Sequence, residues 1–242
     1  MNRLLAIPVG CVSFGYCLLS FPDGATAVLL VALLSLGMVW IIKYVDDDVR
    51  FLIDIFIVAL ILRLLLGATI YVFELFDFFG PDARTYEYVG KVIADVWNGN
   101  GDRSDPFTKL IMRTSGPGWG MNYFSGAIYW IAGSNLFVGQ AICAFFGAAT
   151  APVIYWCAKR MFVNQRVARY AAILVAVFPS MIVWSSQFLK DGLIIFFLVL
   201  SMTMVLEIQR RFNLIAVGIL GLSMFSILSL RFYIFYMVVI SV

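Results

Sequence analysis

Long apolar runs recur along the whole chain and restrict it to one broad class of fold. A helix needs about 20 mostly apolar residues to cross a bilayer. Runs near that length cover 4–21, 25–42, 51–76, 135–157, 168–185, 190–207 and 213–230. The chain is 63% hydrophobic and only 13% charged, far from the composition of a soluble domain. A signal peptide does not explain this composition, since the apolar runs recur along the whole chain. We therefore predict an all-α, polytopic membrane protein with about 7–8 spans.

Two further apolar runs are shorter. Residues 121–133 predict a re-entrant or interfacial helix rather than a full span. The last run, 232–242, stops at the chain end and is too short to cross a bilayer. We therefore expect the chain to be the N-terminal part of a longer protein.

Residue types that are missing exclude several kinds of chemistry. The chain has no histidine, which removes histidine triads, histidine-ligated zinc and imidazole catalysis. Proton transfer then falls to Asp, Glu, Lys, Tyr or water. The four cysteines lie in apolar runs without CxxC spacing and predict small buried hydrophobes. A dispersed net charge of +3 argues against a nucleic-acid partner.

Basic residues predict which loops are cytoplasmic. They gather in "AKRMFVNQRVAR", in "IQRRFN", and at Lys43 and Arg50. If these segments are inside the cell, the segment 77–120, the turn 184–191 and the point near Arg231 lie outside. Four charged residues then share the extracytoplasmic rim, so we expect one site to be formed by Asp82, Lys190, Asp191 and Arg231.

The outer segment 77–120 begins with a helical pattern. From Asp82 onward, apolar residues recur at the spacing of one helix face, namely Tyr86, Val89, Gly90, Ile93, Ala94 and Trp97. Charged residues occupy the other faces, which predicts an amphipathic helix lying along the membrane surface. Asp82 follows Gly80-Pro81 and also has the position of an N-cap. A capping role and a functional role for Asp82 are compatible.

Other charged residues have structural alternatives. Asp191 can simply favour a helix N-terminus, and Arg231 before the last run is a weaker candidate of the same kind. Asp54 and Arg63 stand nine residues apart, on nearly opposite helix faces. They are therefore not direct partners, and Arg63, which lies deeper, must meet another polar group. The run at 46–48, "DDD", predicts a solvated turn.

The motif Asp82-Ala-Arg-Thr-Tyr86, after a span and opening a helix, resembles the polytopic glycosyltransferases of the GT-C fold. The order of the pieces that follow is similar to the dolichyl-phosphate-mannose protein mannosyltransferase and aminoarabinose transferase group, glycosyltransferase family 39. These pieces are "SGPGWGMNYFSGAIYWIAGSN", the basic loop, "FPSMIVWSSQ" and "LKDGL". The resemblance covers about residues 51–207. It implies two additional helices in 1–50 and a GT-C-like core in 51–242.

What the resemblance implies is a transferase that uses a polyprenyl-phosphate-linked sugar at the outer membrane face. The family's catalytic acid maps to Asp82, and a polar residue near the site maps to Asp191 or its neighbour Lys190. Asp191 is therefore the second residue that we expect to be catalytic. One departure is Ala83, where many relatives have a second acid. A divalent metal beside the two aspartates stays open.

The residue types agree with this chemistry independently. Transfer needs a base at the acceptor hydroxyl and cations for the departing phosphate. Asp82 can be the base, while Arg84, Lys190 and Arg231, with Tyr86 of the motif, are candidates for substrate binding. Two other functions stay open. One is a non-catalytic subunit of an envelope-polysaccharide assembly, and the other is a transporter of lipid-linked sugars, which predicts repeated halves that the sequence lacks.

Overall fold

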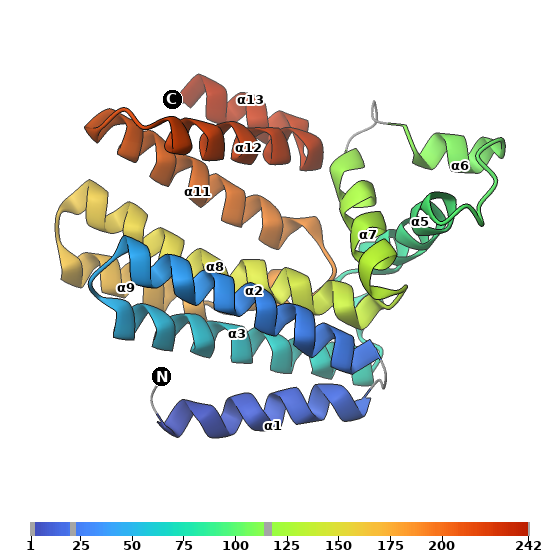
Figure 1. Cartoon of the computed structure of the whole chain (residues 1–242), viewed down its shortest axis with the longest axis horizontal. Coiled ribbons are helices and arrows are strands. Elements are labelled where there is room, and N and C mark those ends of the chain that lie inside the picture. The colour runs from blue at the N-terminus through green and yellow to red at the C-terminus, as the bar shows by residue number, and fades with distance from the viewer. Residues whose placement is uncertain (1–2, 20–22, 114–117, 242) are drawn as a thin grey trace.

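The computed structural model describes residues 3–19, 23–113 and 118–241. Within these ranges the chain forms helices and no strand. The bundle contains α1 (Arg3–Leu19), α2 (Asp23–Val45), α3 (Val49–Val72), α8 (Leu136–Phe162), α9 (Gln165–Val177), α10 (Pro179–Ser185), α11 (Lys190–Arg210), α12 (Leu214–Leu230) and α13 (Phe232–Ser241). Between α3 and α8 come α4 (Phe76–Phe79), α5 (Asp82–Trp97), α6 (Pro106–Ile111) and α7 (Trp119–Ala132). Figure 1 shows α5, α6 and α7 gathered at one end of the bundle. The all-α prediction is confirmed for the described residues.

Fewer helices than expected are long and apolar enough to span a bilayer. In the described ranges, α2, α3, α8 and α11 meet that standard, and α9 with α10 would add a bent fifth. The apolar helix α12 and the N-terminal helix α1 are shorter, at 17 residues each. The predicted count of seven to eight spans is therefore not reached. Length is the physical reason, because about 1.5 Å of rise per residue leaves a 17-residue helix short of the hydrocarbon thickness.

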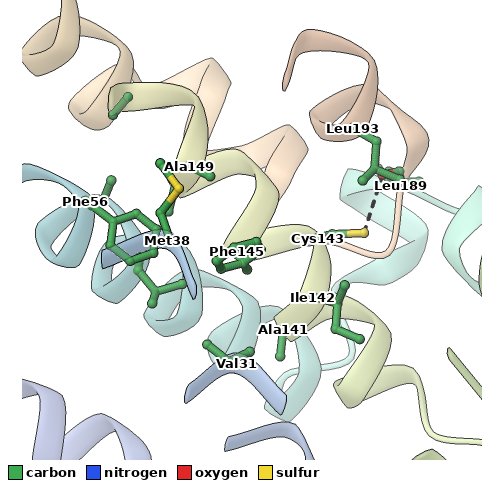
Figure 2. Packing of buried hydrophobic residues seen from close by; sticks show 14 of the residues in the cluster. Val31, Met38, Phe56, Ala141, Ile142, Cys143, Phe145, Ala149, Leu189 and Leu193 are labelled. Carbon is green, nitrogen blue, oxygen red and sulfur yellow. Dashed lines mark hydrogen bonds between the residues drawn. The ribbon is translucent and has the colours of Figure 1, made fainter. Parts of the chain in front are cut away.

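Helix α8 is the centre of the bundle. It packs against α2, α3, α9 and α11, and every residue from Leu136 to Phe145 is buried. Its sequence is rich in Gly and Ala, which lets neighbouring backbones approach closely in a membrane protein. Figure 2 shows Phe145 beside Phe56 of α3, and the Cys143 thiol pointing to the Leu189 carbonyl at 3.7 Å. Cys143 and Cys157 are buried as the sequence predicted, whereas Cys17 is only partly buried and the prediction was wrong for Cys11, which is exposed on the N-terminal helix α1.

Asparagine side chains mark where several helices begin. The Oδ1 atoms of Asn135, Asn164 and Asn213 accept hydrogen bonds from the first-turn amides of α8, α9 and α12. Such N-caps satisfy donors that the helix itself leaves unpaired. The chain thus stops and restarts its helices at defined points between long apolar runs.

The predicted span 168–185 is broken rather than continuous. Helices α9 and α10 meet at an angle of 55° around Phe178 and Pro179. Proline lacks the amide that would continue α9, and it forces the preceding residue out of the helical region. Phe178 is accordingly extended, with φ −65° and ψ 121°. The break redirects α10 toward the start of α11.

Arg63 contacts polar groups, as expected for a charged residue deep in an apolar helix. It is 1% exposed, and its guanidinium donates to the carbonyls of Ala59, Val175 and Ala176 and to the Ser185 hydroxyl. One carboxylate oxygen of Asp54 is buried and has no hydrogen-bond partner among the described residues. Asp54 and Arg63 therefore do not form a pair, as expected.

The acidic run 46–48 is not a solvated turn as a whole. Asp46 accepts from Lys159 Nζ at 2.8 Å. Asp48 accepts two hydrogen bonds from Arg169, both at 2.8 Å, and further ones from Tyr155 and Gln165. These bonds join the α2–α3 turn to α8 and α9. The solvated-turn prediction was wrong for Asp46 and Asp48, because their basic partners come from α8 and α9, more than a hundred residues away in the sequence.

Gly147 is where α8 leaves room for the Arg63–Ser185 contact. A Cβ at this position would overlap Ser185 and lie 2.8 Å from Arg63 Nε. We expect Gly147→Ala to lower the free energy of unfolding by about 1–3 kcal/mol, because the buried contact must shift. The control is Gly37→Ala on α2, where nothing lies within 4 Å of the new Cβ, and where alanine should be neutral or stabilising. Thermal unfolding in detergent measures both, and equal melting temperatures would contradict the expectation.

The Asp48 network makes stability depend on pH. The hydrogen bond from Arg169 holds the pKa of the Asp48 carboxyl below its usual range. The stabilisation is therefore present above the unfolded-state pKa and is lost as the pH falls through the lower folded-state pKa. We expect Asp48→Asn to reduce the melting temperature at neutral pH, and the gap from the wild type to close in acid. Asp47→Asn, at an exposed position of the same turn, is the control. A gap that persists below the folded-state pKa would show that the carboxylate charge is not the cause.

Candidate active site

A pocket of about 430 Å³ opens where four segments meet at the end of the bundle that carries α5 to α7. These segments are the α4–α5 corner, α10, the beginning of α11 and the α12–α13 junction. Their lining residues are Phe79, Gly80, Pro81, Asp82, Ser180, Met181, Trp184, Leu189, Asp191, Ile195 and Arg231. Three of the predicted site residues, Asp82, Asp191 and Arg231, therefore line one pocket although they are up to 149 positions apart (231 − 82).

Gly80 allows the α4–α5 corner to sit directly on the turn before α11. It is buried, and a Cβ there would lie 2.7 Å from Gln187 Oε1 and 2.8 Å from Leu189 Cδ1. Such distances are too short for a side chain without movement of its neighbours. The missing side chain thus brings the start of α5, with Asp82, over the turn 187–189.

Asp82 is the first residue of α5 and not its N-cap. Pro81 holds the cap position, and no side chain caps this helix. The capping interpretation was therefore wrong, because the proline shifts the helix start by one residue. Asp82 is exposed and has no ion-pair or hydrogen-bond partner among the residues that the structure describes. Ala83, by contrast, is fully buried, so the position after Asp82 faces the protein interior and not the pocket.

Helix α5 packs inside the protein along the face that the sequence predicted. Its buried residues include Tyr86, Val89, Gly90, Ile93 and Ala94. This face lies against α7, and a Cβ at Gly90 would be 2.8 Å from Ser125 Cβ. The helix is confirmed, but its apolar face is covered by α7 and is not free to enter a bilayer. Lys91 and Glu87 pair on an outer face at 2.7 Å.

Asp191 and Arg231 form an ion pair across the pocket. Arg231 Nη2 lies 2.9 Å from Asp191 Oδ1, and each side chain is about 30% exposed. Asp191 lies in the first turn of α11, while Arg231 is the extended residue between α12 and α13. The pair therefore ties the start of one helix to the end of another, and it leaves guanidinium donors on the pocket side of the contact.

Lys190 and Tyr86 lie beside this pocket rather than in its lining. Lys190 Nζ is 5.7 Å from the centre of the Tyr86 ring, in a cation–π contact. A Cβ at Gly118 would be 3.5 Å from the same amine. Gly118, which precedes α7, has a φ of 79°, a conformation that favours glycine. The two predicted residues thus come together at the α5–α7 side of the site.

Arg84 points away from the other cations. Its Nε lies 3.9 Å from Asp77 Oδ1 at the surface, and its guanidinium lies 5.8 Å from the centre of the Phe76 ring. Arg84 comes two residues after Asp82, about half a helical turn, and therefore lies on the opposite side of α5. The structure therefore brings Asp82, Asp191 and Arg231 into the pocket, places Lys190 and Tyr86 next to it, and leaves Arg84 outside.

Electrostatics of the pocket favour an anion near α11. Unlike α8, α9 and α12, helix α11 starts without a side-chain cap. The first-turn amides of a helix carry partial positive charge and bind anions. Together with Arg231, they give one wall of the pocket a positive character, while the Asp82 carboxylate comes from the opposite segment.

The aspartates alone do not form a metal site. No group of three or more Asp, Glu, His or Cys side chains in the described ranges lies close enough together to hold an ion. Asp191 is already paired with Arg231. Divalent cations such as Ca²⁺ take six to eight oxygen ligands in proteins, and this donor set does not provide them.

Helix α10 supplies lining residues that the sequence did not single out. Ser180, Met181 and Trp184 all face the pocket. The signal was Pro179 within an apolar run, which predicts a break in the helix. The break places a short helix across the end of the bundle, and only the fold shows that its residues meet Asp82.

A known family matches most of this site. The model of the dolichyl-phosphate-mannose-protein mannosyltransferase family matches residues 84–240, almost two thirds of the chain. The matched region contains Lys190, Asp191 and Arg231, and it begins two residues after Asp82. Neither the curated proteins nor the solved structures gave a match.

The shared pocket predicts that its segments open to one side of the membrane. We expect single cysteines at Asp82 and Ser180 to react with a membrane-impermeant maleimide from the same side. Arg211, at the other end of the 21-residue α11, should react only from the opposite side. Labelling of intact and of permeabilised cells measures this, in a variant without the native cysteines. Reaction of positions 82 and 180 from opposite sides would contradict the pocket.

Proposed function

Because the chain belongs to the dolichyl-phosphate-mannose-protein mannosyltransferase family, we propose that it transfers a sugar from a polyprenyl-phosphate-linked donor to an acceptor hydroxyl in the pocket. The family supports a membrane glycosyltransferase of the mannosyltransferase kind. The observation that carries the finer proposal is the pocket itself, in which an unpartnered carboxylate and a guanidinium face one space.

Asp82 is the catalytic base in this proposal. Its carboxylate takes the proton of the acceptor hydroxyl while the acceptor oxygen bonds to the anomeric carbon of the donor sugar. The bond from that carbon to the phosphate oxygen breaks, and its electron pair leaves with the polyprenyl phosphate. A single displacement of this kind inverts the anomeric centre. The exposure of Asp82 and its freedom from partners keep the carboxylate available for an incoming hydroxyl.

Arg231 stabilises the departing phosphate. A guanidinium forms strong, directional hydrogen bonds with phosphate oxygens, and the uncapped start of α11 adds backbone amides on the same wall. Asp191 then acts by holding Arg231 in place, which refines its predicted role as a catalytic residue. Lys190, steadied by the Tyr86 ring, contributes a second cation at the α5–α7 side, where the donor or acceptor enters.

The distribution of basic residues supports an extracytoplasmic position for this pocket. The α2–α3 and α8–α9 connections, near which Lys43, Arg50, Lys159 and Arg169 stand in the sequence, lie at the end of the bundle opposite α5 (Figure 1), and positive loops stay in the cytoplasm. A polyprenyl chain can then remain in the bilayer while its headgroup reaches the rim. In this proposal residues 1–50 are two helices added to a GT-C-like core in 51–242.

Replacement of the base tests the proposal directly. We expect Asp82→Asn to reduce the rate of sugar transfer by a factor of about 10²–10⁴, the usual contribution of a general base, without loss of inserted protein. Asp95→Asn, at an exposed position later on α5, is the matched control and should transfer normally. The assay uses purified protein with a polyprenyl-phosphate sugar and follows the released polyprenyl phosphate.

Three results would reject the proposal. Transfer by Asp82→Asn at the wild-type rate would remove this carboxylate from the reaction. A wild-type protein that binds the donor with no dependence on Arg231, and transfers nothing, would favour the non-catalytic subunit. Movement of the lipid-linked sugar across vesicles without hydrolysis or transfer would favour the transporter.

A further inference from the structure

We propose that Arg63, on α3, is a positioning residue for the pocket, because it holds the break between α9 and α10 and thereby fixes the wall that α10 forms. This inference rests on the proposed function for its kinetic consequence. Its structural part, the placement of α10, does not depend on which substrate the pocket takes.

The break leaves carbonyl groups at the end of α9 without helical partners. In a continuous helix the amide of residue 179 would donate to the carbonyl of Val175, and the amide of residue 180 to that of Ala176. Pro179 has no amide hydrogen, and the extended Phe178 turns Ser180 into a new helix. Within a bilayer such carbonyls must find another donor, because lipid offers none.

Arg63 provides the missing donors. Its Nη2 lies 3.2 Å from the Val175 carbonyl, and its Nη1 lies 3.1 Å from the Ala176 carbonyl. Nη1 donates a second hydrogen bond, at 3.0 Å, to the carbonyl of Ala59 in its own helix. The guanidinium therefore replaces the two amide donors that the proline and the extended residue removed.

The same side chain also holds the far end of α10. Arg63 Nε donates to the Ser185 hydroxyl at 2.8 Å, and Ser185 is the last residue of that helix. Glycines on both neighbouring helices keep this contact clear, since a Cβ at Gly147 or Gly192 would come within 2.9 Å of Ser185 atoms. The planar guanidinium of Arg63, with donors at Nε, Nη1 and Nη2, thus forms a fork that connects the last turn of α9 to the end of α10. The single ammonium group of a lysine does not present donors in this fixed planar arrangement.

This anchor stands directly behind the pocket. A void of about 10 Å³ beside Arg63 is lined by Met181 and Ile195, and both residues also line the pocket. Ser180 and Trp184 come from the same short helix. If the fork is lost, α10 is free to realign with α9, and the wall opposite Asp82 changes position.

The discriminating experiment separates positioning from stability. Arg63→Met removes the fork, and the double variant Arg63→Met with Pro179→Ala restores backbone donors by letting α9 continue into α10. We expect the double variant to regain the wild-type melting temperature while its KM for the lipid-linked donor stays on the order of tenfold or more above normal, because misplaced pocket walls are costly. Its kcat should change less than its KM.

A second readout does not require activity. We introduce Ser180→Cys into the wild type, into Arg63→Met and into the double variant. The rate at which this cysteine reacts with a water-soluble maleimide should differ several-fold between the wild type and each of the two variants. Arg160→Met is the matched control, since Arg160 pairs with Glu207 at 2.6 Å outside the pocket lining. That control should alter stability without changing the donor KM or the labelling rate at position 180.

The outcomes are distinguishable. A double variant with both normal KM and normal labelling at position 180 would overturn the positioning role. If the wild type transfers no sugar, the proposed function fails, while the labelling comparison still decides whether Arg63 fixes α10. If Arg63→Met does not fold, the double variant alone decides, because its helix carbonyls are satisfied.

Discussion

The buried guanidinium of Arg63 is the contact on which the end of the bundle depends. A polar backbone group in lipid has no water to bind, so a broken helix inside a membrane needs an internal donor. Arg63 meets that need with hydrogen bonds to two carbonyls at the break and to Ser185. Helix α10 can therefore cross the end of the bundle at 55° to α9 instead of continuing toward the surface.

The two ends of the bundle use charge in different ways. At one end, Asp46 pairs with Lys159 and Asp48 pairs with Arg169, and these ion pairs join the α2–α3 turn to α8 and α9. At the other end, charge is only partly neutralised, because Arg231 has one acidic partner while Asp82 has no described partner. Unsatisfied polar groups next to a pocket are available for a substrate, whereas the paired ones stabilise the fold. The family match, residues 84–240, includes Asp191 and Arg231 of the second end and also Lys159 and Arg169 of the first, and it begins two residues after Asp82.

Much of the site could be predicted because sidedness follows from hydropathy and charge. Apolar runs and basic loops were enough to expect Asp82, Asp191 and Arg231 at one rim, and they line one pocket. The amphipathic period of residues 82–97 was also enough to identify the buried face of α5. The placement of α5 along the membrane surface was not confirmed, because the period alone does not say whether an apolar face meets lipid or α7. Arg84 was misplaced for a related reason, since its direction depends on Asp77 in the preceding corner.

Composition and periodicity therefore determined the membrane class and the all-helical fold, because these properties depend on local free energies of transfer. Contacts between remote residues were decided only by the folded structure. The Asp46 and Asp48 ion pairs, the Arg63 fork and the pocket wall made by α10 all join segments that are far apart in the chain. No local pattern encodes such pairings, because their energy arises from three-dimensional packing around α8.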